Sequence, residues 1–217
     1  MDPHSLNPFF ARVCASLNQG LLKLCQETGS LYLSGLYLAA ADPDDDFALS
    51  PSITIDGAHF NHEGYKLLGE TIARLLVEQL GEGDVVLLLG DSITAGYPHY
   101  EPVLMGEHRG DESHSFGHYI RTILGCRVVN RGISGDTTDN MVGRLKDYLA
   151  GTPKMVVLQG GANDAFNGAS FGPGGLSEER AEKVTGVILE NFREMVTLCL
   201  EKECQVAVVP LLPFGVF

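Results

Sequence analysis

The sequence predicts one α/β domain built on a parallel β-sheet. Short apolar runs alternate with stretches of helical periodicity, and such alternation implies right-handed βαβ units. The clearest run, residues 85–89, reads Val-Val-Leu-Leu-Leu, as expected for a strand that is buried on both faces. The chain has 217 residues, 44% of them hydrophobic, which is enough for one domain with a sizeable core.

The first third of the chain is expected to supply two helices, one strand and a long loop. Apolar residues recur at helical spacing up to Gln26, and Gly29 is placed as a C-cap. The long polar loop is of interest because long connections in compact domains are often functional. The expected elements are a helix over residues 6–26, a strand over 31–38, a loop over 41–56 and a helix from 61 or 62 to 80.

Residues 81–84 (Gly-Glu-Gly-Asp) form a short, flexible joint, after which strands and helices alternate regularly. A glycine-rich stretch near residue 170 predicts a mobile loop. The expected elements are strands over 85–89, 126–130, 155–159 and 205–209, helices over 115–124 and 138–149, the loop over 167–175, and a long helix from 177.

Charge and composition exclude several classes of function. A net charge of −13 argues against nucleic acid or an anionic membrane surface as partner. No segment has the roughly 20 apolar residues that a membrane span needs. The five cysteines lack CxxC spacing, and the first residues lack a signal-peptide pattern, so we expect free thiols and a cytoplasmic location.

Ser92 directly follows the most apolar strand, at the edge of the sheet where ligands and catalytic groups collect. A serine there can hold its hydroxyl above the sheet, with its own N–H at the positive end of the next helix. Asp91 and Ser92 are equally typical of a helix N-cap. On these residues alone, both interpretations stay open.

Two further strand ends offer hydrogen-bond donors. Gly135 can bring a backbone N–H close to a ligand because it has no side chain, although for this glycine alone a tight turn is the favoured explanation. Asn163 supplies a side-chain amide, although an Asn-Asp pair is also a common helix cap. Together with the Ser92 N–H, these groups could bind an oxyanion.

His59 is the candidate base for a serine nucleophile. Asp56 lies three residues before it in a loop, so its carboxylate can reach Nδ1 and leave Nε2 free to accept the serine proton. An exposed Asp and His without a role is the alternative. The histidines at 108, 114 and 118 fit no metal-ligand spacing, so no metal site is predicted.

Four segments together resemble the signature blocks of SGNH (GDSL-type) hydrolases. Two of them look like the arylesterase, acyl-thioesterase and lysophospholipase branch. The four segments are residues 90–97, 130–137, 161–164 and 56–59. The resemblance implies Ser92 as nucleophile, Gly135 and Asn163 as oxyanion donors, and His59 with Asp56 as base and orienter. It also implies a three-layer α/β/α fold with a flavodoxin-like, five-stranded parallel sheet.

The order of the blocks departs from the family, in which the Asp-x-x-His block comes last. The chain therefore resembles a circular permutant of a single domain spanning residues 1–217. Residues 1–80 would correspond to the family's C-terminal part, 81–84 to a joint, and 85–217 to its N-terminal part. If the joint is too short to close back, two chains would exchange residues 1–80.

The predicted function is a serine esterase that acts through an acyl-enzyme on carboxylic esters with short acyl chains, aryl, alkyl or acetyl. The resemblance implies a small-molecule ester substrate and no cofactor. The alternatives are a carbohydrate acetylesterase, a lysophospholipase or a thioesterase of the same family, and an inactive ligand-binding domain. The sequence leaves the oligomeric state open.

Overall fold

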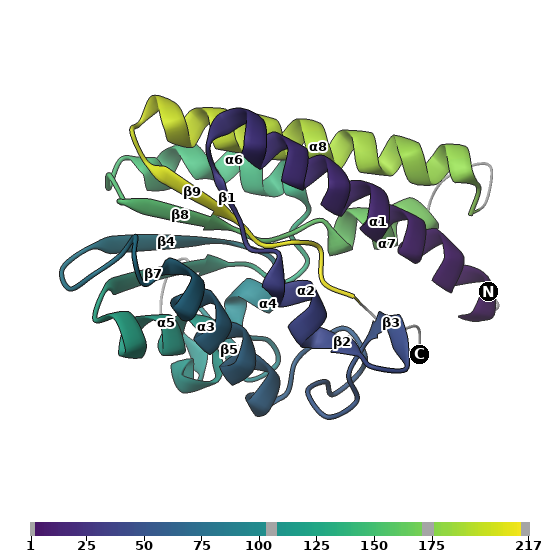
Figure 1. The fold of residues 1–217 in the computed structure, drawn as a ribbon, viewed down its shortest axis with the longest axis horizontal. Coiled ribbons are helices and arrows are strands. Elements are labelled where there is room, and N and C mark those ends of the chain that lie inside the picture. Colours follow the sequence, from purple (N-terminus) through teal and green to yellow (C-terminus); the bar gives the residue numbers. More distant parts are fainter. Residues whose placement is uncertain (1–2, 103–107, 171–175, 214–217) are drawn as a thin grey trace.

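The computed structural model describes residues 3–102, 108–170 and 176–213. In this part of the chain, a five-stranded parallel sheet lies between two layers of helices (Figure 1). The elements up to the first central strand are α1 (Pro3–Thr28), β1 (Leu31–Tyr32), α2 (Gly35–Ala40), β2 (Ala41–Asp42), β3 (Asp45–Leu49), α3 (His62–Leu76) and β4 (Val85–Gly90). They are followed by α4 (Ser92–Ala95), β5 (Tyr100–Glu101), β6 (Arg109–Gly110), a 3₁₀ turn (Glu112–His114), α5 (Phe116–Leu124), β7 (Arg127–Gly132), α6 (Thr138–Leu149), β8 (Met155–Leu158), α7 (Ala162–Ser170), α8 (Glu178–Glu201) and β9 (Gln205–Val208).

The sheet has the strand order β1-β9-β8-β4-β7. Counted from β4 as the first strand, this order is 2-1-3-4-5 from β7 to β1, which is the flavodoxin-like order. The fifth position is filled by β1, which comes from the start of the chain and pairs in parallel with β9. The predicted fold class is therefore confirmed, with an N-terminal strand at one edge.

Alternating side chains of the central strands face the two helical layers. Leu87 and Leu89 of β4 lie in the core with α1, α6 and α8, whereas Val86 and Leu88 pack on the side of α3 and α5. Figure 1 shows these two sets of helices on opposite faces of the sheet. The strand was recognisable from sequence because both of its faces are buried.

Three sequence predictions were wrong in detail. The strand expected over 31–38 ends at Tyr32, and α2 follows: Leu36 and Ala40 are buried while Leu38 between them is exposed, as in a helix and unlike one face of a strand. The loop expected over 41–56 contains the β2–β3 hairpin. Of the mobile loop expected over 167–175, residues 167–170 continue α7, and residues 171–175 lie outside the described residues.

The joint between α3 and β4 closes within one chain. The backbone N–H of Gly81 donates to the Asp84 carboxylate at 2.9 Å, and Lys154 forms an ion pair with the same carboxylate at 2.7 Å. Residues 3–80 thus pack on the sheet of their own chain, with α3 against α5 and α1 against α8. Exchange of this segment between two chains is not needed to complete the fold.

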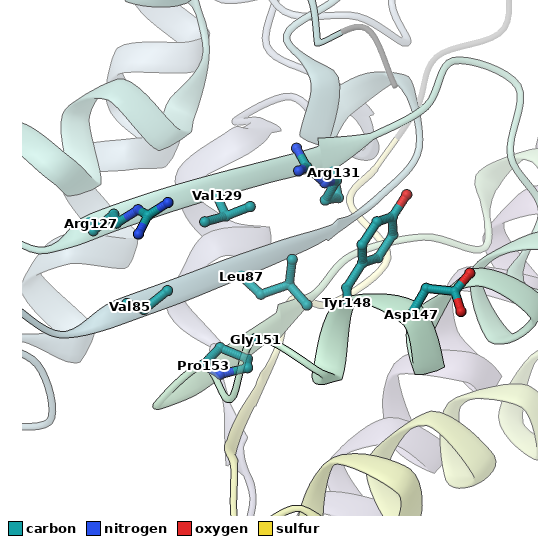
Figure 2. A pocket seen from close by; sticks show the side chains of 9 residues that line it. All are labelled: Val85, Leu87, Arg127, Val129, Arg131, Asp147, Tyr148, Gly151 and Pro153. Atoms are coloured by element: carbon teal, nitrogen blue, oxygen red, sulfur yellow. The ribbon is translucent and has the colours of Figure 1, made fainter. Parts of the chain in front are cut away.

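One corner of the sheet is left uncovered, for a topological reason. Helix α6 connects β7 to β8 and packs over β4, so it does not cover the outer part of the edge strand β7. A groove of about 300 Å³ lies there, with an apolar floor that includes Leu87 and Val129 (Figure 2). The Arg131 guanidinium stacks over the Tyr148 ring at 5.3 Å and covers part of this floor.

All five cysteines are buried free thiols, which agrees with the expectation from their spacing. Among the described residues, no helix is long and apolar enough to cross a membrane.

Candidate active site

Ser92 is the first residue of α4 and lies at the carboxyl end of β4. Asp91 caps this helix: its carboxylate accepts from the Ile93 N–H at 2.9 Å. The two sequence interpretations of this turn are therefore compatible, because Asp91 serves as the cap while Ser92 keeps its hydroxyl available. The Gln159 amide also donates to Asp91, at 3.3 Å. Complete burial raises the pKa of Asp91 to about 6, although both hydrogen bonds oppose the rise.

His59 lies between Ser92 and Asp56. Its Nε2 atom is 3.1 Å from the Ser92 Oγ, and its Nδ1 atom is 2.7 Å from Asp56 Oδ2. The serine and the histidine are 33 residues apart in sequence. The structure thus brings together the three side chains predicted as nucleophile, base and orienter, in one continuous line of hydrogen bonds.

The Asp56 carboxylate is held in the ionised form. Partial burial acts to raise its pKa, but hydrogen bonds from the His59 ring and from the backbone N–H groups of His59 and Ala58 outweigh that effect and lower the pKa. The two backbone bonds to Oδ1 measure 2.6 and 3.0 Å. An ionised carboxylate accepts a hydrogen bond from Nδ1–H, so the ring proton stays on Nδ1 and Nε2 is left as an acceptor.

The loop that carries this pair is closed by its own hydrogen bonds. The Thr54 hydroxyl donates to the His59 carbonyl at 2.7 Å and accepts from the Gly57 N–H at 2.7 Å. Gly57 adopts a φ of +77°, which is readily accessible to glycine. These bonds set the spacing of Asp56 and His59, although none of them reaches Ser92.

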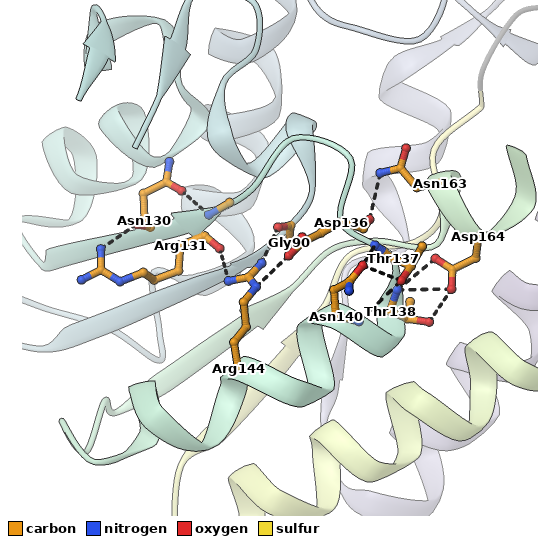
Figure 3. A network of polar contacts seen from close by, with 11 residues as sticks. Gly90, Asn130, Arg131, Asp136, Thr137, Thr138, Asn140, Arg144, Asn163 and Asp164 are labelled. Atoms are coloured by element: carbon orange, nitrogen blue, oxygen red, sulfur yellow. Dashed lines mark hydrogen bonds and ion pairs between the residues drawn. The ribbon is translucent and has the colours of Figure 1, made fainter. Parts of the chain in front are cut away.

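The two other predicted donors follow the neighbouring strands. Gly135, with a φ of +87°, follows β7, and among the described residues beyond its two chain neighbours no heavy atom lies within 4 Å of the position that a Cβ would take. The Asn163 amide, at the start of α7, donates to the Asp136 carbonyl at 2.8 Å (Figure 3). This bond ties Asn163 to the residue after Gly135. An amide NH₂ has two N–H groups, so one remains for a ligand.

A buried arginine that the sequence analysis did not single out supports this second turn. Arg144 of α6 bonds the Asp136 carboxylate at 2.7 Å and also donates to the carbonyls of Arg131 and Gly90 (Figure 3). Both partners of the ion pair are largely buried, with side chains 14% and 13% exposed. Burial raises the pKa of Asp136, and the Arg144 charge opposes this rise. The sequence offers one sign that Arg144 is buried: it stands next to Leu145, which is a buried residue of the otherwise polar helix α6.

Three histidines outside this line form a cluster of tilted rings. The His114 ring centroid lies 4.5 Å from that of His62 and 5.2 Å from that of His99. Within residues 3–102, 108–170 and 176–213, no group of three His, Cys, Asp or Glu side chains is placed to hold a metal ion.

Comparison with known proteins gives matches to one family. The model of the GDSL-like lipase/acylhydrolase family matches residues 88–217. An arylesterase from Vibrio mimicus is 30% identical over 135 residues, which are 58% of this chain and 54% of the relative. Esterase TesA from Pseudomonas aeruginosa is 32% identical over 107 residues, 47% of this chain and 48% of the relative.

Among solved structures, the crystal structure of TesA matches with a TM-score of 0.44 at 25% sequence identity, covering 58% of this chain and 59% of that one. The chain spans about half the length of the curated relatives it matches. The Asp56–His59 segment lies before the residues that the family model matches.

Proposed function

Because this chain belongs to the GDSL-like lipase/acylhydrolase family, we propose that it is a serine esterase that hydrolyses carboxylic esters with short acyl chains. The observation that carries the proposal is the line of hydrogen bonds from Ser92 through His59 to Asp56. An arrangement of nucleophile, base and orienter in contact is the geometry that activates a serine hydroxyl. An inactive binding domain would have no need of this alignment.

The proposed reaction is a two-step acyl transfer. His59 Nε2 takes the Ser92 proton as Oγ attacks the ester carbonyl, and the ionised Asp56 stabilises the imidazolium that forms. The N–H groups of Ser92 and Gly135 and the Asn163 amide hold the oxyanion. His59 then gives its proton to the leaving alcohol. Water, activated by the same imidazole, hydrolyses the acyl-enzyme and releases the acid.

The test is a series of p-nitrophenyl esters from acetate to decanoate, measured on the wild-type protein and on Ser92→Ala. We expect the highest kcat/KM for the shortest chains and a loss of about 10⁴-fold or more in the variant. Ser16→Ala, an exposed serine of α1, is the matched control and should keep full activity. Full esterase activity in Ser92→Ala would overturn the proposal. Preference for long acyl chains or acetylated sugars would redirect the substrate assignment.

We also propose that the family's blocks stand here in circularly permuted order. In support, the sheet has the 2-1-3-4-5 order only when counted from β4, with β1 as its fifth strand. Asn18 of α1 exchanges two hydrogen bonds with the backbone of Leu211, so the segments that a permutation would join lie side by side. A rearranged chain with residues 85–217 before residues 1–80 should fold and keep its activity within several-fold. An unfolded product would contradict the proposal.

A further inference from the structure

The distance between His59 and Ser92 depends on contacts outside the loop that carries the base. Asp56 and His59 belong to one closed turn, and Ser92 belongs to a different element, α4. The imidazole makes one hydrogen bond on each side: Nδ1 bonds Asp56, which belongs to the same turn, and Nε2 bonds Ser92 on the other element. The His59 side chain is 24% exposed, so part of the ring faces water. A packing contact on the ring from the Ser92 side adds to these two bonds in holding the turn and α4 in register.

Tyr97 provides this contact from the side of the nucleophile. Its ring packs edge-on against the His59 ring, with 4.9 Å between centroids and 61° between planes. Its backbone N–H donates to the Ser92 carbonyl at 3.0 Å, just after the left-handed Gly96 that ends α4. Tyr97 is therefore tied to the element that carries the serine while it touches the base.

Tyr65 ties the same residue to the side of the base. It lies on α3, close after the loop, and is completely buried. Its hydroxyl donates to the Tyr97 carbonyl at 2.6 Å, and its ring packs against Phe60, the neighbour of His59. The two tyrosines thus form a clasp between the loop of the base and the helix of the nucleophile.

Core packing constrains Tyr97 less than it constrains Tyr65. Tyr97 is 38% exposed, whereas Tyr65 is fully buried. The part of Tyr97 that remains in water gains nothing from burial, so specific contacts carry more of its placement. Three contacts place Tyr97. Its ring packs on the His59 imidazole, its N–H donates to the Ser92 carbonyl, and its carbonyl accepts from the Tyr65 hydroxyl.

We propose that Tyr97, anchored by the Tyr65 hydroxyl, is a positioning residue that holds the His59 imidazole in line with the Ser92 hydroxyl. The inference rests on the proposed esterase function. Catalysis through a serine needs Nε2 within hydrogen-bonding reach of Oγ, and a misplacement of about 1 Å can cost on the order of 10²-fold in rate. The Tyr97 ring acts on the base and does not itself exchange a proton.

The test compares Tyr97→Leu with Tyr97→Phe. Leucine removes the ring edge, so kcat should fall by about 10-fold or more while KM stays within twofold. Phenylalanine keeps the ring and should keep activity close to wild type. Tyr65→Phe removes only the hydroxyl that anchors Tyr97, and a several-fold loss of kcat is expected. Leu200→Ala, which trims an apolar side chain of similar exposure near the C-terminal end of α8, is the control and should leave kcat unchanged.

A second readout separates positioning from substrate contact. If Tyr97 acts through His59, its loss should slow p-nitrophenyl acetate and ethyl acetate by the same factor. The loss should also disappear in a His59→Ala background, where no imidazole remains to be held. A loss confined to the aryl ester, or one that persists without His59, would overturn the inference.

The inference and the proposed function fail in different ways. A wild-type protein without Ser92-dependent ester hydrolysis would remove the proposed function. An active wild-type protein whose Tyr97→Leu variant keeps its full kcat would overturn only the positioning role. Thermal unfolding of each variant, expected as one cooperative transition well above the assay temperature, excludes loss of the fold as the cause.

Discussion

On one side of Ser92, the His59 ring bonds the Asp56 carboxylate at 2.7 Å and the Ser92 hydroxyl at 3.1 Å. On the other side, Asn163 is held through the backbone of Asp136, whose carboxylate bonds the buried Arg144. The first arrangement is a local turn at the surface, and the second is part of the buried scaffold. Substitutions in the first should therefore remove chemistry and spare stability, whereas substitutions in the second should affect both.

Among these variants, Asp56→Asn should cause the largest loss of activity, because Asp56 orients the base His59. An amide facing Nδ1 favours the imidazole tautomer with its proton on Nε2, which cannot accept the serine proton, so kcat/KM should fall by about 10⁴-fold. The side chain is 41% exposed, so the free energy of unfolding should change little. Activity and urea unfolding test this pair of results. Asp44→Asn, in the exposed β2–β3 turn, is the control.

Arg144→Met should affect stability most strongly. The change leaves the largely buried Asp136 carboxylate without its ion-pair partner, and the carbonyls of Arg131 and Gly90 each lose a hydrogen-bond donor. The free energy of unfolding should therefore fall by about 3–5 kcal/mol. The exposed ion pair of Arg193 with Glu27 is the contrast. Arg193→Met should cost less than about 1 kcal/mol. Equal costs in the two variants, measured by urea unfolding, would remove the distinction between buried scaffold and surface.

Asn163→Ala should slow the reaction by about 10²–10³-fold with little change in KM, as expected for an oxyanion donor that acts mainly in the transition state. Asn167→Ala, on the exposed side of the same helix, should keep wild-type kinetics. If the two variants behave alike, Asn163 is a helix residue and not a donor.

Asp91→Asn should give the smallest effect and one that depends on pH. The pKa of Asp91 is about 6 in the folded protein, above the ordinary 3.8, so the folded state holds a proton that the unfolded chain releases between pH 4 and 6. Stability therefore falls as pH rises through that window. Above pH 7 the variant, which carries no buried charge, should be more stable than wild type by about 1–3 kcal/mol. Below pH 4 the difference should vanish, and a difference independent of pH would contradict this account.

The chain from residue 85 onward was largely predictable from sequence, and the part before it less so. Residues 85–89 form a continuous apolar run because both faces of the strand are buried. In the helix over 138–149, the buried residues recur at helical spacing because one face packs on the core. The run over 31–38 has apolar residues that fit a strand as well as a helix, and only contacts with the rest of the fold end β1 at Tyr32.

The candidate site divides in the same way. Asp56, His59 and Ser92 were found because each belongs to a short motif, and the structure places them in contact. Tyr65, Tyr97 and Arg144 act through contacts between segments far apart in the chain. No spacing in the sequence encodes those contacts, so residues of this kind emerge only from the fold.

The most direct test of the account is to map the adduct formed with a fluorophosphonate, which labels an activated serine. The central claim is that the His59 imidazole, from the first third of the chain, activates the Ser92 hydroxyl. Mass spectrometry should then find one adduct, on the peptide that contains Ser92, and His59→Ala should slow its formation by about 10²-fold or more. An adduct on another residue, or an unchanged rate in His59→Ala, would contradict the claim.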